Sequence, residues 1–189
     1  MKLRNFCSGE FANLKQVEEN DMVLYKLNEY DPDYKDAFHG KDILSFDVYG
    51  QGDDKVGSVK NVMVDEEDSL RYFIVDTGFW IFGKNVLLPV GMSRIDFDDN
   101  RVYAPTLTKQ QVEDLPEFTE DLKIDNDYEE QVRGIYRPSM AMPAAGFLYS
   151  PMTYNYALEP YFYEMNEPYI RDYEERRRSR RNRNRADIL

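Results

Sequence analysis

Two glycines and two aspartates lie close together in the run Gly50-Gln51-Gly52-Asp53-Asp54-Lys55. The start of this run resembles the glycine fingerprint with which a loop cradles the phosphates of a dinucleotide. That chemistry requires a third glycine and a helix N-terminus directly after the loop. Lys55 stands where the third glycine belongs, and a β-type run follows it. We therefore expect a turn here and no nucleotide site.

A second acidic run, Asp96-Phe97-Asp98-Asp99-Asn100, begins like a calcium-binding loop. Such a loop needs a glycine at its sharp turn and a glutamate that binds the ion through both oxygens at its end. Arg101 and Leu107 occupy those two positions. The pattern therefore predicts a solvated hairpin turn.

Nucleophilic catalysis would need a cysteine or serine next to a base. The chain has one cysteine, Cys7, and one histidine, His39, which lies beside Gly40 in a polar stretch. These two residues are also too few for the four ligands of a structural zinc site. Carboxylates are so abundant that a catalytic pair could not be recognised among them. We expect a protein that is not an enzyme and has no metal and no cofactor.

Asp76 is unusual because it stands inside the apolar run of residues 71–77. Buried polar groups normally have structural hydrogen-bond partners. We therefore expect its carboxylate to accept hydrogen bonds from a neighbouring turn.

An aromatic run, Phe79-Trp80-Ile81-Phe82, follows directly. As a strand it would place Trp80 and Phe82 on one face and the other two side chains on the opposite face. Tryptophan and phenylalanine concentrate binding energy at protein interfaces. Two interpretations stay open, since the run can cover the end of a folded domain or contact a partner. Phe79, Trp80 and Phe82 are our candidate partner-binding residues.

Seven arginines lie near the C-terminal end of the sequence, namely Arg176, Arg177, Arg178, Arg180, Arg181, Arg183 and Arg185. They give residues 176–189 a net charge of +6, whereas the first 175 residues carry -18. Clustered arginines attract the phosphates of nucleic acids and anionic lipids, but the acidic body repels both. A solvated tail is the first interpretation, and binding of RNA or anionic lipid through these arginines is the alternative.

The centre of the chain has the sequence pattern of a small β domain. Short β-type runs are separated by polar turns, at residues 43–49, 56–64, 71–77, 79–82, 86–90, 94–97 and 101–103. This spacing leaves no room for crossover helices, so we predict a mainly β fold with a small six-stranded antiparallel barrel. We expect a core that includes Val62, Val64, Ile74, Val75, Leu87 and Leu88.

Two local signals refine this fold. Gly57 interrupts a strand pattern, which marks a place where another backbone approaches closely. Thr108 and Gln111 have the spacing of a capping box, which predicts a short helix that ends before Pro116. Val112 and Leu115, three positions apart, would let this helix close one end of the barrel.

We divide the chain into a lead-in segment at residues 1–40, a barrel domain at 41–118 and a tail at 119–189. The tail is rich in aromatic residues and proline, and we expect it to be disordered. No apolar run is long enough to span a bilayer, and no secretory-type apolar run follows the N-terminus. With its single cysteine the protein is expected to be cytoplasmic, at most peripheral at a membrane.

Several segments together resemble the PRC-barrel family, and their order and spacing match over residues 41–118. The segments are Lys55-Val56-Gly57-Ser58-Val59, Val64-Asp65, Leu70-Arg71-Tyr72-Phe73-Ile74-Val75-Asp76-Thr77-Gly78, Phe82-Gly83-Lys84 and Val86-Leu87-Leu88-Pro89-Val90. The family is named after the cytoplasmic domain of the H subunit of bacterial photosynthetic reaction centres. It also occurs in a ribosome-maturation factor and in standalone bacterial proteins. The resemblance implies a six-stranded barrel used for protein–protein contact, without a shared catalytic residue.

The sequence is more similar to the standalone members. It lacks the membrane-spanning helix of the reaction-centre subunit, and residues 1–40 are too short for the additional barrel of the ribosome factor. We therefore expect a non-catalytic adaptor that binds a protein partner or a second copy of itself. An RNA- or ribosome-associated factor that uses the arginine-rich tail is the alternative.

Overall fold

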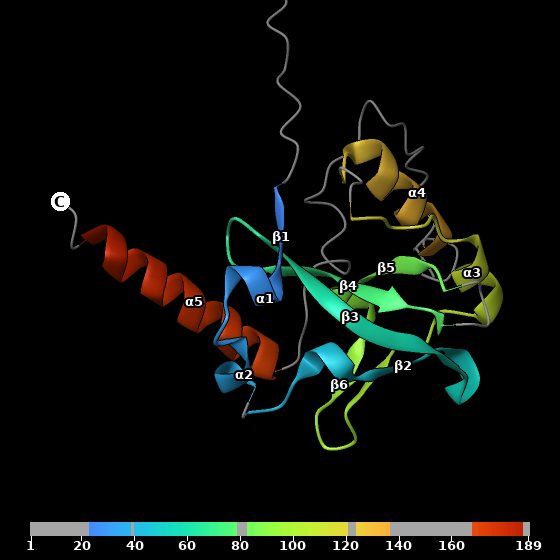
Figure 1. Cartoon of the computed structure of the whole chain (residues 1–189), viewed down its shortest axis with the longest axis horizontal. Coiled ribbons are helices and arrows are strands. Elements are labelled where there is room, and N and C mark those ends of the chain that lie inside the picture. Colours follow the sequence, from blue (N-terminus) through green and yellow to red (C-terminus); the bar gives the residue numbers. More distant parts are fainter. Residues whose placement is uncertain (1–22, 39, 79–82, 121–123, 137–167, 187–189) are drawn as a thin grey trace, which may run out of the picture.

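The computed structural model describes residues 23–38, 40–78, 83–120, 124–136 and 168–186 (Figure 1). Within these residues the strands are β1 (Leu24–Lys26), β2 (Asp47–Tyr49), β3 (Lys55–Asp65), β4 (Leu70–Asp76), β5 (Asn85–Pro89), β6 (Arg94–Asp96) and β7 (Arg101–Tyr103). The helices are α1 (Leu27–Tyr30), α2 (Tyr34–Ala37), α3 (Lys109–Asp114), α4 (Asn126–Tyr136) and α5 (Pro168–Ala186). Short 3-10 turns cover Ile43–Ser45, Gln51–Asp53 and Val90–Met92.

The strands form one mixed sheet in the order β5-β4-β3-β2-β7-β6, and β1 pairs with β3 outside this path. β2 and β7 run parallel, with Val48 opposite Val102, while the other pairs are antiparallel. In the described part of the chain no pairing joins β5 to β6, so the sheet stays open.

The prediction of a six-stranded antiparallel barrel was therefore wrong in strand number, strand direction and closure. The physical reason is that alternation of apolar and polar residues reports which face of a strand is buried. It carries no information on whether the neighbouring strand runs in the same or the opposite direction.

The individual strands and the core follow the sequence pattern closely. Val62, Val64, Ile74, Val75, Leu87 and Leu88 are all buried, each with 3% exposure or less, which confirms the predicted core. The strand expected at 43–49 is confined to β2, because residues 43–45 form a 3-10 turn. The aromatic run at 79–82 lies outside the described residues.

Gly57 lies on β3, close to the backbone at the end of β4. A side-chain Cβ at this position would come within 2.3 Å of the Asp76 carbonyl oxygen and 2.8 Å of a Val75 methyl group. The predicted close approach of a second backbone is thus confirmed.

The predicted capping box at the start of α3 is also confirmed. The Thr108 hydroxyl accepts a hydrogen bond from the Gln111 amide, and the Gln111 side chain accepts one from the Thr108 amide. Val112 and Leu115 are buried. The Gln111 side chain also donates to the Ile135 carbonyl at 3.0 Å, which ties α3 to α4.

Two helices lie in the part of the chain expected to be disordered. In α4, Val132 is fully buried and the Tyr136 hydroxyl donates to the Leu87 carbonyl at 3.0 Å. In α5, Ile170 and Tyr173 are buried with 1% exposure each. The expectation of disorder was therefore wrong for residues 126–136 and 168–186.

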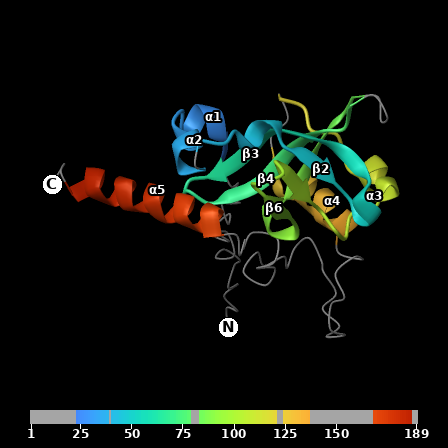
Figure 2. The same cartoon turned by 90° about the horizontal axis from the view of Figure 1, so that it is seen from below.

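The reason for this error is that proline at the first position of a helix is compatible with helix formation, as Pro168 is here. In addition, the few apolar side chains of α5 are buried against residues that are far away in the sequence, such as Phe38. The local composition around α5 does not include these residues. Figure 2 shows α5 leaving the side of the molecule where α1 and α2 lie. None of the helices in the described ranges is long and apolar enough to cross a membrane. Residues 137–167 lie outside these ranges.

Candidate binding site

A row of three side chains lies on the outer face of β2, β7 and β6. Tyr49 stands opposite Tyr103 on the parallel pair, and Tyr103 stands opposite Arg94 on the antiparallel pair. Their neighbours Val48 and Val102 point the other way and are fully buried. The period-2 alternation of the strands therefore places the two tyrosines and the arginine together on the surface.

The rings and guanidinium groups of this row are in contact. The ring centroids of Tyr49 and Tyr103 lie 5.8 Å apart. The guanidinium of Arg94 lies 4.5 Å from the centroid of Tyr103, and that of Arg101 lies 4.8 Å from the centroid of Tyr49. These separations are typical of cation–π contacts. We call these four residues the Tyr–Arg face.

Arg101 also donates a hydrogen bond to the Tyr103 hydroxyl at 3.4 Å. This bond, together with the neighbouring Tyr49, raises the pKa of Arg101. An arginine guanidinium is charged at every ordinary pH, so Arg101 presents a permanent positive charge beside the rings.

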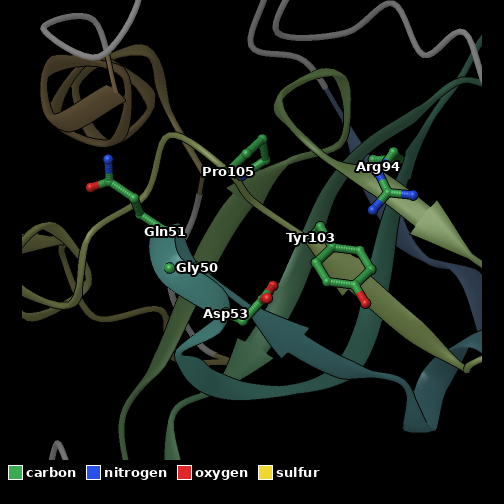
Figure 3. A pocket seen from close by; sticks show the side chains of 7 residues that line it. Gly50, Gln51, Asp53, Arg94, Tyr103 and Pro105 are labelled. Carbon is green, nitrogen blue, oxygen red and sulfur yellow. The ribbon is translucent and has the colours of Figure 1, made fainter.

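A pocket of about 490 Å³ adjoins the Tyr–Arg face (Figure 3). It is lined by Gly50, Gln51, Gly52, Asp53, Arg94, Tyr103 and Pro105. Figure 3 shows the Tyr103 ring beside the Arg94 guanidinium, and the Gln51 side chain pointing away from both. The pocket therefore offers an aromatic ring and a cation, with the Asp53 carboxylate as its acidic group.

The turn that forms the wall of the pocket depends on its glycines. Gly52 has a φ of 77°, which favours glycine. A Cβ at Gly50 would lie 2.5 Å from the Leu107 carbonyl oxygen, and this same oxygen accepts a hydrogen bond from the Gln51 amide at 2.8 Å. The turn leads into β3 at Lys55, as the sequence predicted, and no helix N-terminus follows it. Its geometry is unlike that of a dinucleotide loop.

The other two polar motifs have structural roles, as expected. The Asp96 carboxylate accepts hydrogen bonds from the Asp98 and Asp99 amides at 3.0 and 3.1 Å, which shapes the turn between β6 and β7. The Asp76 carboxylate accepts a hydrogen bond from the Gly78 amide at 2.8 Å. Among the described residues no group of three or more His, Cys, Asp or Glu side chains is arranged to hold a metal ion.

The arginines of the C-terminal segment have different surroundings in the structure. Arg177, Arg178 and Arg181 face the sheet domain, where they contact carboxylates and carbonyl oxygens. Arg176 forms an ion pair with Asp172 on the same helix at 2.5 Å.

Arg180 and Arg183 are exposed on the outer side of α5. The side chain of Arg185 is outside the described part of the structure, as are Phe79, Trp80, Phe82, Cys7 and His39.

Sequence reasoning missed the Tyr–Arg face. Each of its residues follows the period-2 pattern of a strand with one exposed face, which identifies it as outward-facing. The pattern does not indicate that β2 and β7 are neighbours, because Tyr49 and Tyr103 are 54 positions apart in the chain.

Comparison with known proteins agrees with the resemblance seen in the sequence. Residues 35–111 match the PRC-barrel domain. An uncharacterized protein of Deinococcus radiodurans is 46% identical over 115 residues, which cover 58% of this chain and 37% of that protein. The chain thus spans little more than a third of the length of this relative. By this match, residues 35–111 are a PRC-barrel domain, which takes up about two fifths of the chain.

Proposed function

We propose that the chain is a non-catalytic protein-binding module of the cytoplasm, and that the Tyr–Arg face is its contact surface. The family supports a small domain without enzymatic activity. The observation that carries the proposal is the row of Tyr49, Tyr103 and Arg94 on the outer face of the sheet, beside a pocket of about 490 Å³.

The chemistry of this surface suits an extended segment of a partner protein. Tyrosine provides a large and rigid contact area at a low cost in side-chain entropy, and tyrosine and arginine are enriched among the residues that dominate interface energies. An aromatic or proline ring of the partner would stack on Tyr103. A carboxylate next to that ring would be bound by Arg94, whose planar guanidinium matches a carboxylate with two hydrogen bonds.

A site-specific photo-crosslinking experiment tests this proposal. A photoreactive phenylalanine analogue replaces Tyr103 in one full-length variant and Tyr25 in the matched control. Tyr25 is 40% exposed and lies on β1, away from the Tyr–Arg face. We expect one discrete protein, which includes the case of a second copy of this chain, to be crosslinked from position 103 and not from position 25.

A second substitution confirms the chemistry of the contact. Arg94→Ala in the position-103 crosslinking variant should abolish the crosslink and leave the thermal unfolding midpoint unchanged, because Arg94 is exposed. If position 103 gives no discrete protein, or if the crosslink survives Arg94→Ala, the Tyr–Arg face is not the contact surface.

The alternative function, an RNA- or ribosome-associated factor, depends on the arginines of the C-terminal segment. What weighs against it is that Arg177, Arg178 and Arg181 contact the chain's own acidic body. The outward-facing Arg180 and Arg183 are what supports it. Phe79, Trp80 and Phe82 stay candidate contacts for the protein partner.

A further inference from the structure

One face of α5 has a regular spacing of residues that contact the sheet domain. Ile170, Tyr173, Arg177 and Arg181 follow one another at intervals of three or four positions, which places them on one side of the helix. The Tyr173 ring stacks on Phe38, with centroids 5.3 Å apart. The apolar half of this face is therefore at the beginning of the helix, and the charged half comes after it.

The charged half enters a site made of Tyr30, Asp31 and Asp68, which we call the acidic cradle. Arg177 lies 3.7 Å from the Asp31 carboxylate and 3.5 Å from that of Asp68. Its guanidinium also lies 4.8 Å from the centroid of the Tyr30 ring. Arg181 lies 3.3 Å from the second carboxylate oxygen of Asp68. Two arginines one helical turn apart thus share one carboxylate.

One contact that holds the cradle together does not involve α5. The Tyr30 hydroxyl donates to the Asp68 carboxylate at 2.7 Å, which fixes the position of the acid and of the ring together. Asp31 and Asp68 are 5% and 1% exposed with α5 in place. Their burial is favourable only because cations lie against them, since a buried carboxylate without a counter-charge is costly.

The turn between β3 and β4 supplies neutral acceptors at the rim of the cradle. The Arg178 guanidinium donates to the Glu67 carbonyl at 3.0 Å and to the Ser69 hydroxyl at 2.5 Å. Arg181 donates to the Glu66 carbonyl. These acceptors suit guanidinium groups, which present several donors in a fixed plane.

The fit of α5 in the cradle is incomplete. The buried Asp68 oxygen Oδ2 accepts no hydrogen bond from the described residues, although Arg181 is near enough for an ion pair. The helix joins the rest of the described structure through residues 137–167 at its N-terminal end, and residues 187–189 follow it. A helix with the same side chains and better hydrogen-bond geometry could therefore replace it.

We propose that the acidic cradle is a receptor site for an arginine-bearing helix of a partner protein, and that α5 occupies it as a tethered competitor. The helix that fits has a tyrosine followed by arginines four and eight positions later, as Tyr173, Arg177 and Arg181 are spaced in α5. This is the helix-in-groove mode of recognition, with charged anchors in place of most apolar ones. The site is separate from the Tyr–Arg face, so the two proposals stand independently.

The test uses the full-length chain and a fluorescent peptide with the sequence of residues 167–187. In one protein variant, Arg177→Gln and Arg181→Gln weaken the hold of the chain's own α5. We expect the peptide to bind this variant at least tenfold more tightly than the unchanged protein, because the tethered helix competes less. Asp68→Asn added to the variant should abolish the binding. Fluorescence anisotropy measures all three affinities, and circular dichroism confirms that each protein is folded.

Two peptides of equal charge separate recognition from general attraction to an acidic protein. One carries Arg177→Gln and Arg181→Gln, and the other carries Arg180→Gln and Arg183→Gln, which are outward-facing in α5. We expect only the second peptide to bind like the original. Equal binding of both peptides, or binding that Asp68→Asn leaves unchanged, would overturn the proposal.

If α5 stays docked in the variant, it blocks the cradle, and the peptide cannot bind even if the cradle is a receptor site. Hydrogen exchange of α5 detects this case, and Tyr173→Ala added to the two arginine substitutions then removes the stacked ring as well. If the peptide binds neither variant although α5 exchanges freely, α5 is a structural element of this fold and the cradle is not a receptor.

Discussion

The Tyr72 hydroxyl donates a hydrogen bond to the Glu129 carboxylate at 2.6 Å, in the interior of the protein between β4 and α4. The same carboxylate lies 3.3 Å from Arg133, whose side chain is fully buried. Tyr72 of the sheet is therefore joined to Glu129 and Arg133, which lie one turn apart on α4. This buried group fixes α4 on the domain.

Glu129→Gln should destabilise the protein by about 3–5 kcal/mol, because it removes a counter-charge of the buried Arg133. Urea unfolding followed by circular dichroism measures the change. Asp127→Asn, on an exposed position of the first turn of the same helix, is the control and should cost about 0.5 kcal/mol. A similar small effect of Glu129→Gln would mean that the buried Glu129–Arg133 pair contributes little to holding α4 on the domain.

Alanine substitutions at two glycines should have opposite effects. Gly57→Ala forces a Cβ against the Asp76 carbonyl and should cost about 1–3 kcal/mol. Gly134 lies inside α4, and a Cβ added there would meet open space, so Gly134→Ala should stabilise the protein by about 0.5–1 kcal/mol. Thermal unfolding midpoints should move in opposite directions, and a lower midpoint for Gly134→Ala contradicts the position given to α4.

Leu87→Ala should cost about 2–5 kcal/mol, because the side chain is fully buried and its loss leaves a cavity. Val23→Ala is the matched control, since Val23 is 44% exposed. Denaturant titration compares the two variants, and equal stability would be incompatible with β5 in the core.

Asp42 gives the stability a defined dependence on pH. Burial would raise the pKa of this carboxyl group, but hydrogen bonds from Lys35 and Tyr34 and from the Leu44 amide lower the pKa below its ordinary 3.8. The carboxylate therefore stabilises the fold above about pH 4, and this contribution is lost as the pH falls through the lowered value. Asp42→Asn should be less stable than the unchanged protein at pH 7, and in urea titrations the difference should shrink as the pH falls below 3.8 and through the lowered pKa of Asp42.

Replacing both Trp80 and Phe82 by alanine should weaken partner binding by about 1–4 kcal/mol if their rings are interface anchors. Arg180→Gln with Arg183→Gln should leave protein binding intact, because these arginines are exposed on α5 and lie outside the aromatic run. Titration calorimetry with the crosslinked partner measures both effects. Loss of binding with the arginine pair, and not with the aromatic pair, would show that the exposed arginines of α5, and not the aromatic run, contact the partner.

The sequence predicted those parts of the fold that depend on neighbouring residues. The apolar run around Leu87 identified a buried strand, and the Thr108 capping box located the start of α3, because both signals are complete within a few positions. The burial of Ile170 on a distant surface left no local trace. Composition alone therefore suggested disorder where α5 forms.

The candidate sites show the same division. Asp76 was correctly assigned a turn partner, since that partner is two residues away. The Tyr–Arg face depends on the parallel pairing of β2 with β7, and the acidic cradle depends on the contact of Asp68 with Arg177. Residues so far apart in the chain come together only because of the strand order and the packing of the helices. No local sequence pattern indicates these long-range contacts.

The parallel pairing of Val48 with Val102 also sets an order of events during folding. The strands β2, β3 and β4 each pair with the next strand along the chain, so their loops close at a small cost in entropy. The pairing of β2 with β7 must wait for a strand 54 positions further on. During synthesis, Tyr49 leaves the ribosome long before Tyr103. We expect the surface that they form to be absent from the growing chain, so a partner that binds there distinguishes the finished protein from its nascent form.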